Sequence, residues 1–331
     1  MDRRNAHNAR RRLRARRMMV LGPALVSTMV LATTAAWALI TPTKVLVMPA
    51  IQVLPFSNGT YLAYTSNSRS EPKHFNAYAR RLSDGRTIRI NASGTEGFEG
   101  GFDPGTNTVI YQQVKSASSD IYTFNLDTRV RHRVGQIDTK RWEAQPRISA
   151  SSITFFREYY SRSTGKPYVG MFIYSRTSGS SRLVAFSDLN IWNGSLGDRY
   201  ATYTRCGGKS CTAWVYDRRS DIQKGLRIPS PNQVPQYAPV VDETNDLVFF
   251  ARSGFHCGQG VRILQVPLTR LGAKPTKVAA LPTGSDLDNE ASLSLNAGTN
   301  MYDYLFTRVT CPYNSANIYS VQGVSAGPVT G

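Results

Sequence analysis

Apolar and polar residues alternate in short runs through most of the sequence after the first forty residues, and turn-forming residues separate the runs. The stretch from Glu99 to Arg131 shows this most clearly. It reads as a turn at Asp103–Gly105, a short strand ending at Tyr111, a loop, a second strand over 120–126, a turn and a third strand. The pattern therefore predicts an all-β protein.

The same arrangement occurs six times. In each copy one apolar strand ends on an aromatic residue, and these residues are 47, 45, 47, 47 and 56 positions apart: Tyr64, Tyr111, Phe156, Tyr203, Phe250 and Phe306. Another strand follows each of them, centred on Tyr78, Tyr122, Tyr174, Tyr216, Leu264 and Tyr319. Four-stranded units with a period in the forties are the blades of β-propellers. The sequence therefore predicts a six-bladed β-propeller.

The sixth unit stops one strand short, because its last strand lies at Asn317–Val321 and none follows. The apolar segment Lys44–Met48 precedes the strands of the first unit. The blades must close into a ring, because each buries its two faces against its neighbours. We expect the N-terminal strand to complete the sixth blade and close the ring, which also removes open strand edges.

A proline or a turn residue precedes the apolar-aromatic strand in several units. The residues that carry this pattern are Phe102-Asp103-Pro104-Gly105 with Ile110-Tyr111, Gln145–Ser149 with Phe155-Phe156, Ala238–Asp242 with Phe249-Phe250, and the pairs Ile121-Tyr122, Ile173-Tyr174 and Ile318-Tyr319. On these residues the chain resembles TolB-like six-bladed propellers over residues 44–322. The Ser-Pro-Asp-Gly turn of that family is degenerate here, and the N-terminal domain of TolB has no counterpart. The resemblance therefore implies an exported bacterial propeller, closer to those of Gram-positive bacteria, and not a TolB-type role in outer-membrane transport.

An export segment precedes the propeller. Residues 1–17 are rich in Arg, and Met18–Ile40 follow with 23 positions free of charge. A helix of that length spans about 35 Å, which is enough for a bilayer, and the positive flank favours export of everything that follows. Ala36-Trp37-Ala38 fits a cleavage site, so a secreted protein and one anchored on the extracellular side both stay open. The expected parts are a basic tail with a signal peptide or membrane anchor (1–40), a propeller (41–322) and a flexible tail (323–331).

The composition adds a strong positive charge. The formal net charge is +18, of which +7 lies in residues 1–40 and +11 in the remainder. Such an excess suggests an anionic partner, and the alternative is an Arg-rich, solvated strand surface without a partner. Because the chain is predicted to be exported, nucleic acid is not an expected partner.

The four cysteines lie late in the chain, at Cys206, Cys211, Cys257 and Cys311. An even number in an exported protein predicts disulfides. All four fall in predicted loops between the second and third strands of blades four to six. Cys206–Cys211 fits a bond within one hairpin, which leaves Cys257–Cys311 to join blades five and six. A zinc site at His256 and Cys257 is the alternative, but paired C-x-x-C spacing is absent.

The sequence contains no strong catalytic motif. There is no G-x-S-x-G elbow, and none of the four histidines comes with an adjacent acid–nucleophile set. Acidic residues do gather just before the predicted innermost strands, near the mouth of the central channel: Glu96, Glu99, Glu143, Asp188, Asp286, Asp288 and Glu290. Paired carboxylates suit glycosidic chemistry, a ring of them suits a cation such as calcium, and turn or strand capping is the plain alternative. We expect no cofactor other than such a cation.

In an antiparallel blade, the link into the first strand and the loop between the second and third strands emerge on the same face. The longest of these loops span 66–76, 157–170 and 253–260 and carry aromatic and basic residues: Tyr159, Tyr160, Arg162, Lys166, Tyr168, Phe255 and His256. Such residues suit proteins, sugars and anionic polymers; the alternative for the tyrosines is packing of the loop onto its blade. We therefore predict a non-enzymatic scaffold that binds a protein or a cell-envelope polymer through this face. A glycan hydrolase or lyase that uses the channel-mouth acids is the alternative.

Overall fold

The computed structural model describes residues 41–327 apart from a set of short gaps. The gaps are at positions 49, 68–69, 72, 117, 162, 188–190, 208–209, 221–225, 231–233, 254–257, 297 and 312–314. The predicted leader at 1–40 lies outside the described residues, so its cleavage or anchoring stays a prediction. Between residues 41 and 327, less those gaps, no helix is long and apolar enough to cross a membrane.

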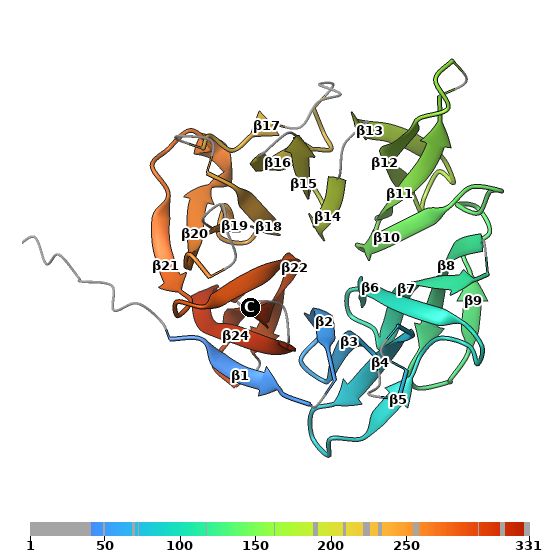
Figure 1. Cartoon of the computed structure of the whole chain (residues 1–331), viewed down its shortest axis with the longest axis horizontal. Coiled ribbons are helices and arrows are strands. Elements are labelled where there is room, and N and C mark those ends of the chain that lie inside the picture. The colour runs from blue at the N-terminus through green and yellow to red at the C-terminus, as the bar shows by residue number, and fades with distance from the viewer. Residues whose placement is uncertain are drawn as a thin grey trace, which may run out of the picture. The chain divides into compact units, whose positions relative to one another are not determined.

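Six four-stranded antiparallel sheets surround a common centre as the blades of a propeller (Figure 1). The strands of blades one to three are β2 (Gln52–Ser57), β3 (Tyr61–Asn67), β4 (Phe75–Arg81), β5 (Thr87–Arg89); β6 (Glu96–Phe102), β7 (Thr108–Lys115), β8 (Ser118–Asn125), β9 (Arg131–Arg133); and β10 (Glu143–Ile148), β11 (Ser152–Tyr160), β12 (Pro167–Ser175), β13 (Ser181–Ser187). Those of blades four to six are β14 (Ile191–Leu196), β15 (Tyr200–Gly207), β16 (Ser210–Asp217), β17 (Leu226–Arg227); β18 (Gln236–Asp242), β19 (Leu247–Ser253), β20 (Val261–Pro267), β21 (Thr276–Ala280); and β22 (Ser285–Asn296), β23 (Met301–Thr310), β24 (Ser315–Ala326), β1 (Thr43–Leu46). The all-β six-bladed propeller predicted from the sequence is confirmed.

The aromatic residues of the sequence repeat lie on the second strand of each blade. All six are buried, with at most 3% of their surface exposed: Tyr64, Tyr111, Phe156, Tyr203, Phe250 and Phe306. Tyr64 lies opposite Tyr78 in the β3–β4 ladder, and Tyr111 lies opposite Tyr122 in the β7–β8 ladder. Burial of a large apolar side chain stabilises a fold by about 1.5–3 kcal/mol. The residues that repeat in the sequence are therefore the residues that form the buried core of each blade.

Each blade has two ends, which lie on opposite faces of the propeller. We call the end with the hairpins between second and third strands, such as 160–167, the loop face. We call the end with the hairpins between first and second strands, such as 102–108, the turn face. On the turn face, Arg176 of blade three binds both carboxylate oxygens of Asp103 in blade two, at 2.7 and 2.8 Å. The Asp103–Gly105 turn therefore links neighbouring blades.

The N-terminal strand β1 pairs antiparallel with β24 and forms the outer edge of the sixth sheet, whose order is β1-β24-β23-β22. Leu46 of β1 is buried in a cluster with Leu62 and Tyr64 of blade one and Leu305 and Ile318 of blade six. The first and last blades therefore share an apolar interface to which β1 contributes.

The last strand extends beyond residue 322, the boundary expected from the sequence between the propeller and a flexible tail. Strand β24 continues to Ala326, where it pairs with Met301 of β23. The Ser325 hydroxyl also donates a hydrogen bond of 2.5 Å to Asp242 of blade five. Residues 323–326 remain ordered because both the ladder and a neighbouring blade hold them.

Every innermost strand contains a β-bulge. The pairing with the second strand shifts register between Val53 and Phe56, Glu99 and Gly101, Ala144 and Arg147, Asn193 and Leu196, Tyr237 and Val240, and Leu287 and Ala291. A bulge bends its strand and re-aims the adjacent side chains. At two bulges the backbones of neighbouring blades approach so closely that a Cβ on Gly100 would meet the Pro146 carbonyl oxygen and one on Gly194 would meet that of Pro239.

Gly100→Ala should therefore destabilise the propeller by about 1–3 kcal/mol, because the added methyl group would overpack two inner strands. Urea unfolding followed by circular dichroism measures the change. Gly135→Ala is the matched control, since a Cβ there meets nothing within 4 Å, and it should change stability by less than about 0.5 kcal/mol. Equal stability of the two variants would contradict the close approach at the bulge.

Candidate functional site

An exposed group of aromatic and basic side chains lies at the loop-face end of blade three. The Tyr159 ring on β11 stacks on Tyr168 of β12, with centroids 5.4 Å apart, and Tyr168 meets Phe186 of β13 edge to face at 4.4 Å. The Cζ atom of Arg141, in the link into the blade, lies 4.2 Å from the centroid of the Tyr159 ring. We call Arg141, Tyr159, Tyr168 and Phe186 the aromatic platform. Phe186 is 47% exposed, so solvent reaches the platform.

The platform exists because β11 and β12 continue beyond Arg157, the residue of β11 that pairs with the start of the innermost strand β10. The segment 157–170 was expected to be a loop, but β11 runs to Tyr160 and β12 starts at Pro167. Tyr159 pairs directly with Tyr168 in this ladder. Successive side chains on a strand point to opposite faces. Tyr160, which is 63% exposed, therefore lies on the other face of the hairpin from the platform.

Sequence reasoning found part of this surface. It selected Tyr159, Tyr160 and Tyr168, of which the structure brings Tyr159 and Tyr168 together. The predicted contributors Arg162 and His256 lie outside the described residues. Arg141 and Phe186 were missed, although Phe186 carries a readable signal: it is a large apolar residue next to the polar end of its strand.

Two of the predicted acids meet a buried arginine inside the channel. Glu290 of β22 pairs with the Nη2 atom of Arg147 of β10, and both residues lie at bulges. The Arg147 Nε–H donates to the Gly194 carbonyl oxygen at 2.8 Å, and its Nη1–H donates to that of Pro146 at 2.7 Å. Glu99, on β6, is the third member of what we call the channel triad. Arg147 is 2% exposed, Glu290 4% and Glu99 1%.

Glu99 lacks the partners that Glu290 has. Neither of its carboxylate oxygens accepts a hydrogen bond from a described side chain, and the Gly101 backbone N–H is only a weak donor to them. Burial raises the pKa of Glu99 well above its ordinary value of 4.5; the Arg147 charge acts against this shift, and the Glu290 charge reinforces it. One guanidinium cannot neutralise two buried carboxylates. Burial therefore favours the neutral form of Glu99 more than it would for an exposed glutamate.

The raised pKa of Glu99 predicts a pH-dependent stability. Above pH 4.5 the unfolded chain releases the Glu99 proton and the folded chain keeps it, so stability falls as the pH rises towards the raised pKa. Glu99→Gln, which mimics the protonated acid, should raise the free energy of unfolding by more than about 1 kcal/mol at pH 7. The gain should vanish below pH 4, as measured by urea unfolding across pH. A gain that does not depend on pH would contradict the raised pKa.

The remaining predicted acids lie elsewhere, so the acids do not form one ring. Glu143 is fully buried beside Asp120 and Asp138, with ligand-type oxygens within 4.8 Å of one another. Arg133 bridges Asp120 and Asp138 at 2.9 and 2.8 Å, and Arg157 binds Glu143 at 2.9 Å. Burial raises the pKa of Glu143, against the effect of Arg157.

The other acids of the prediction add little to this picture. Glu96 is 3.8 Å from the His74 ring nitrogen Nδ1, and Asp286 is half-buried. Asp188 lies outside the described residues, and only the backbone of Asp288 is described. Cation binding by these acids stays a prediction.

The channel itself contains a small cavity towards the turn face, beneath Arg147. Its volume is about 200 Å³, and all six innermost strands line it, through residues that include Phe56, Gly101, Arg147, Leu196, Val240 and Leu293. Sites for drug-sized ligands are commonly 300–1,000 Å³. The channel cavity is therefore smaller than the sites that usually hold such ligands.

Two cysteines stabilise the loop face of blade four. Cys206 and Cys211 form a disulfide across the end of the β15–β16 hairpin. Cys311 is also disulfide-bonded, and Cys257, the partner predicted for it, lies outside the described residues. The hairpin is thus covalently fixed where it reaches solvent.

Comparison with known proteins shows a likeness of fold. No protein-family model and no curated protein matches the sequence. TolB from Acinetobacter baumannii superposes with a TM-score of 0.57 at 12% identity over 82% of this chain and 66% of that one, so the chain spans just under two thirds of its length. A putative TolB from Agrobacterium tumefaciens superposes with a TM-score of 0.56 at 14% identity, over 85% of this chain and 92% of that one. An oligogalacturonate lyase from Vibrio parahaemolyticus superposes with a TM-score of 0.51 at 10% identity, over 84% of this chain and 81% of that one.

Proteins with different activities share this architecture, and at these identities the likeness concerns the fold alone. The six antiparallel sheets of this chain form that architecture. The chain has the six-bladed β-propeller fold and is similar in fold to the TolB structures.

Proposed function

We propose that this protein is a non-enzymatic scaffold outside the cytoplasm that binds an anionic cell-envelope polymer through its loop face. The aromatic platform of blade three is the observation that supports the proposal. Its rings are stacked, partly exposed and fixed on long paired strands, so binding costs little side-chain entropy. Aromatic surfaces of this kind serve both sugars and proteins, and a protein is the other class of partner.

Charge favours the polymer over the protein. The chain outside residues 1–40 carries a formal charge of +11. Arg141 belongs to the platform, and exposed Lys140 and Lys166 lie close to it in sequence. A positive surface attracts polyanions before contact, and stacked rings then offer a flat face to a sugar unit. A polymer that alternates sugar rings and negative groups matches both features.

Export and ring closure are part of the proposal. The composition of residues 1–40 suits an export leader, as signal peptide or anchor, and disulfides such as Cys206–Cys211 persist in oxidising compartments. The β1–β24 ladder supports closure of the ring by the N-terminal strand, because that strand fills the outer position of the sixth blade. We expect closure to keep the loop face rigid.

Binding of the purified protein to isolated anionic envelope polymer tests the proposal. The double variant Tyr159→Ala/Tyr168→Ala should weaken binding about tenfold, because it removes the stacked pair. Arg141→Gln should weaken binding chiefly at low salt, since salt screens exposed charges. Co-sedimentation at several salt concentrations measures both effects.

Tyr302→Ala is the matched control, because Tyr302 is a partly exposed tyrosine at the start of β23, on the turn face. It should bind the polymer as the unmodified protein does. If the double variant loses a captured protein but still binds polymer, the partner is a protein. If it loses neither, the platform is not the binding site.

A glycan hydrolase or lyase is the second candidate. The raised pKa of Glu99 beside the Arg147–Glu290 pair favours it, because a protonated carboxyl can act as a general acid at neutral pH. The burial of all three residues acts against it, since a glycosidic bond must reach the acid. Turnover of envelope glycan by the protein, abolished by Glu99→Gln without loss of folding, would support this candidate. Absence of turnover in the unmodified protein would remove it.

A further inference from the structure

A polar pocket lies on the loop face of blade four, next to the disulfide. Its volume is about 550 Å³, and its lining includes Arg205 and Thr212 with Trp214 and Arg227. Serines 210 and 230 complete the polar wall. The size falls within the range of 300–1,000 Å³ that is usual for small-ligand sites. This pocket belongs to blade four and shares no residue with the aromatic platform.

The strand register places the key side chains on one face of the sheet. Arg205 of β15 lies directly opposite Thr212 of β16, and Trp214 lies directly opposite Arg227 of β17. Directly opposed residues share a face, as do residues two apart on one strand. Two arginines, a tryptophan and a threonine therefore point into the same hollow from three neighbouring strands.

Three of the side chains that line this pocket carry donors with no acceptor among the described residues. The guanidinium groups of Arg205 and Arg227 make no hydrogen bond or ion pair with any described residue. The buried indole N–H of Trp214 likewise has no partner in the described part of the chain. Arg199, on the turn face of the same blade, binds Asp217 at 2.6 Å. Arg205 is half-buried and Arg227 is exposed, so both guanidinium groups can donate to the acceptor oxygens of a ligand.

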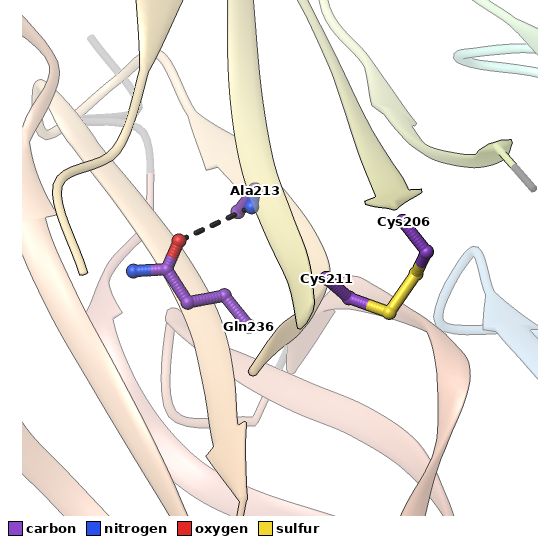
Figure 2. Close-up of a disulfide and its surroundings, with 4 residues drawn as sticks. All are labelled: Cys206, Cys211, Ala213 and Gln236. Carbon is purple, nitrogen blue, oxygen red and sulfur yellow. Dashed lines mark hydrogen bonds between the residues drawn. A yellow bond between two sulfur atoms is a disulfide. The ribbon is translucent and has the colours of Figure 1, made fainter. Parts of the chain in front are cut away.

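The frame of the pocket is fixed before any ligand arrives. Figure 2 shows the Cys206–Cys211 disulfide across the hairpin and Gln236 of β18 reaching towards Ala213 of β16. The Ala213 amide donates to the Gln236 side-chain oxygen at 3.2 Å, which ties blade four to blade five. The Trp214 ring also stacks on Tyr203, with centroids 6.0 Å apart. Such constraints reduce the ordering cost of binding.

We propose that this pocket binds an oxyanion, carried as a carboxylate or a phosphate group on a sugar unit. Two planar guanidinium groups match the paired oxygens of either anion, and such charge-assisted hydrogen bonds are the strong ones. The hydroxyl of Thr212 is a further hydrogen-bonding group, and Trp214 forms part of the pocket wall. The site goes beyond the scaffold function, because it needs neither the platform nor a polymer.

Calorimetric titration of the full protein with inorganic phosphate in one arm and glucuronate in the other tests the site, with tryptophan fluorescence as a second readout. Saturable binding of at least one probe is expected, and the tighter arm identifies the anion. Arg205→Gln/Arg227→Gln should weaken it at least about tenfold, because each residue loses charge-assisted hydrogen bonds. Trp214→Phe should remove the fluorescence response, because Trp214 forms part of the pocket wall.

Two controls separate the site from general charge attraction. Arg199→Gln removes one positive charge from the same blade and should leave the affinity unchanged. Arg205→Lys/Arg227→Lys keeps both charges but loses the paired donors, and should bind more weakly than the unmodified protein. Tyr159→Ala/Tyr168→Ala should bind both probes normally, which keeps this result separate from that of the platform. No saturable binding of either probe, or equal loss in Arg199→Gln and in the Arg205→Gln/Arg227→Gln variant, would overturn the assignment.

Discussion

A chain that begins at Met48 should unfold at a much lower denaturant concentration than one that begins at Thr41. The shorter chain lacks β1, whose Leu46 is 6% exposed and lies in the cluster between blades one and six. It also loses the ladder to β24 and the contact of 3.1 Å between the hydroxyls of Thr43 and Ser320. Burial of one leucine and several hydrogen bonds together contribute about 3–5 kcal/mol.

The shorter chain should also aggregate, because β24 would become a long exposed edge strand. Urea unfolding with light scattering measures both effects. Val45→Ala is the matched control, since Val45 is 40% exposed on the same strand, and it should shift stability by less than about 0.5 kcal/mol. Coincident unfolding curves for the two chains would show that β1 does not hold the ring.

Arg147→Met should destabilise the protein by about 3–5 kcal/mol at pH 7, because it leaves Glu290 buried without its counter-charge. The loss should shrink in acid, where Glu290 can take up a proton. Adding Glu290→Gln should recover most of the stability, since the double variant buries no charge at this point. Urea unfolding of all four combinations gives the coupling between the two residues.

Arg176→Met provides the comparison for this ion pair. Its bidentate pair with Asp103 lies on the turn face, with the Arg176 side chain 35% exposed, and exposed pairs contribute about 0–1 kcal/mol. A loss in Arg147→Met no larger than that in Arg176→Met would contradict a buried, mutually dependent triad.

The sequence predicts the blades well because the strands that pair within a blade are close together in the sequence. Tyr64 and Tyr78, or Tyr111 and Tyr122, are close in sequence and directly paired in space, so alternation and turn chemistry reveal them. The channel triad could not be predicted in this way. Arg147 and Glu290 are separated by 143 positions, and they meet only when the ring of blades brings the inner strands together.

The candidate site shows the same limit at short range. Polar and turn-forming residues near Ser161–Lys166 made 157–170 resemble a loop, so Tyr159 and Tyr160 were grouped as neighbours on one surface. The strands in fact continue to Tyr160 and from Pro167, and alternation separates the two rings. The anion pocket of blade four depends on register across three strands, which no single segment reveals.

Hydrogen exchange of the protein with and without isolated anionic envelope polymer tests the central claim most directly. The account predicts slower exchange in the presence of polymer at the loop-face end of blade three, in peptides that cover 139–143, 157–170 and 183–187. Exchange at the turn face, in peptides that cover 103–108 and 149–152, should stay unchanged. Protection confined to the turn face, or no protection anywhere at saturating polymer, would contradict a loop-face binding scaffold.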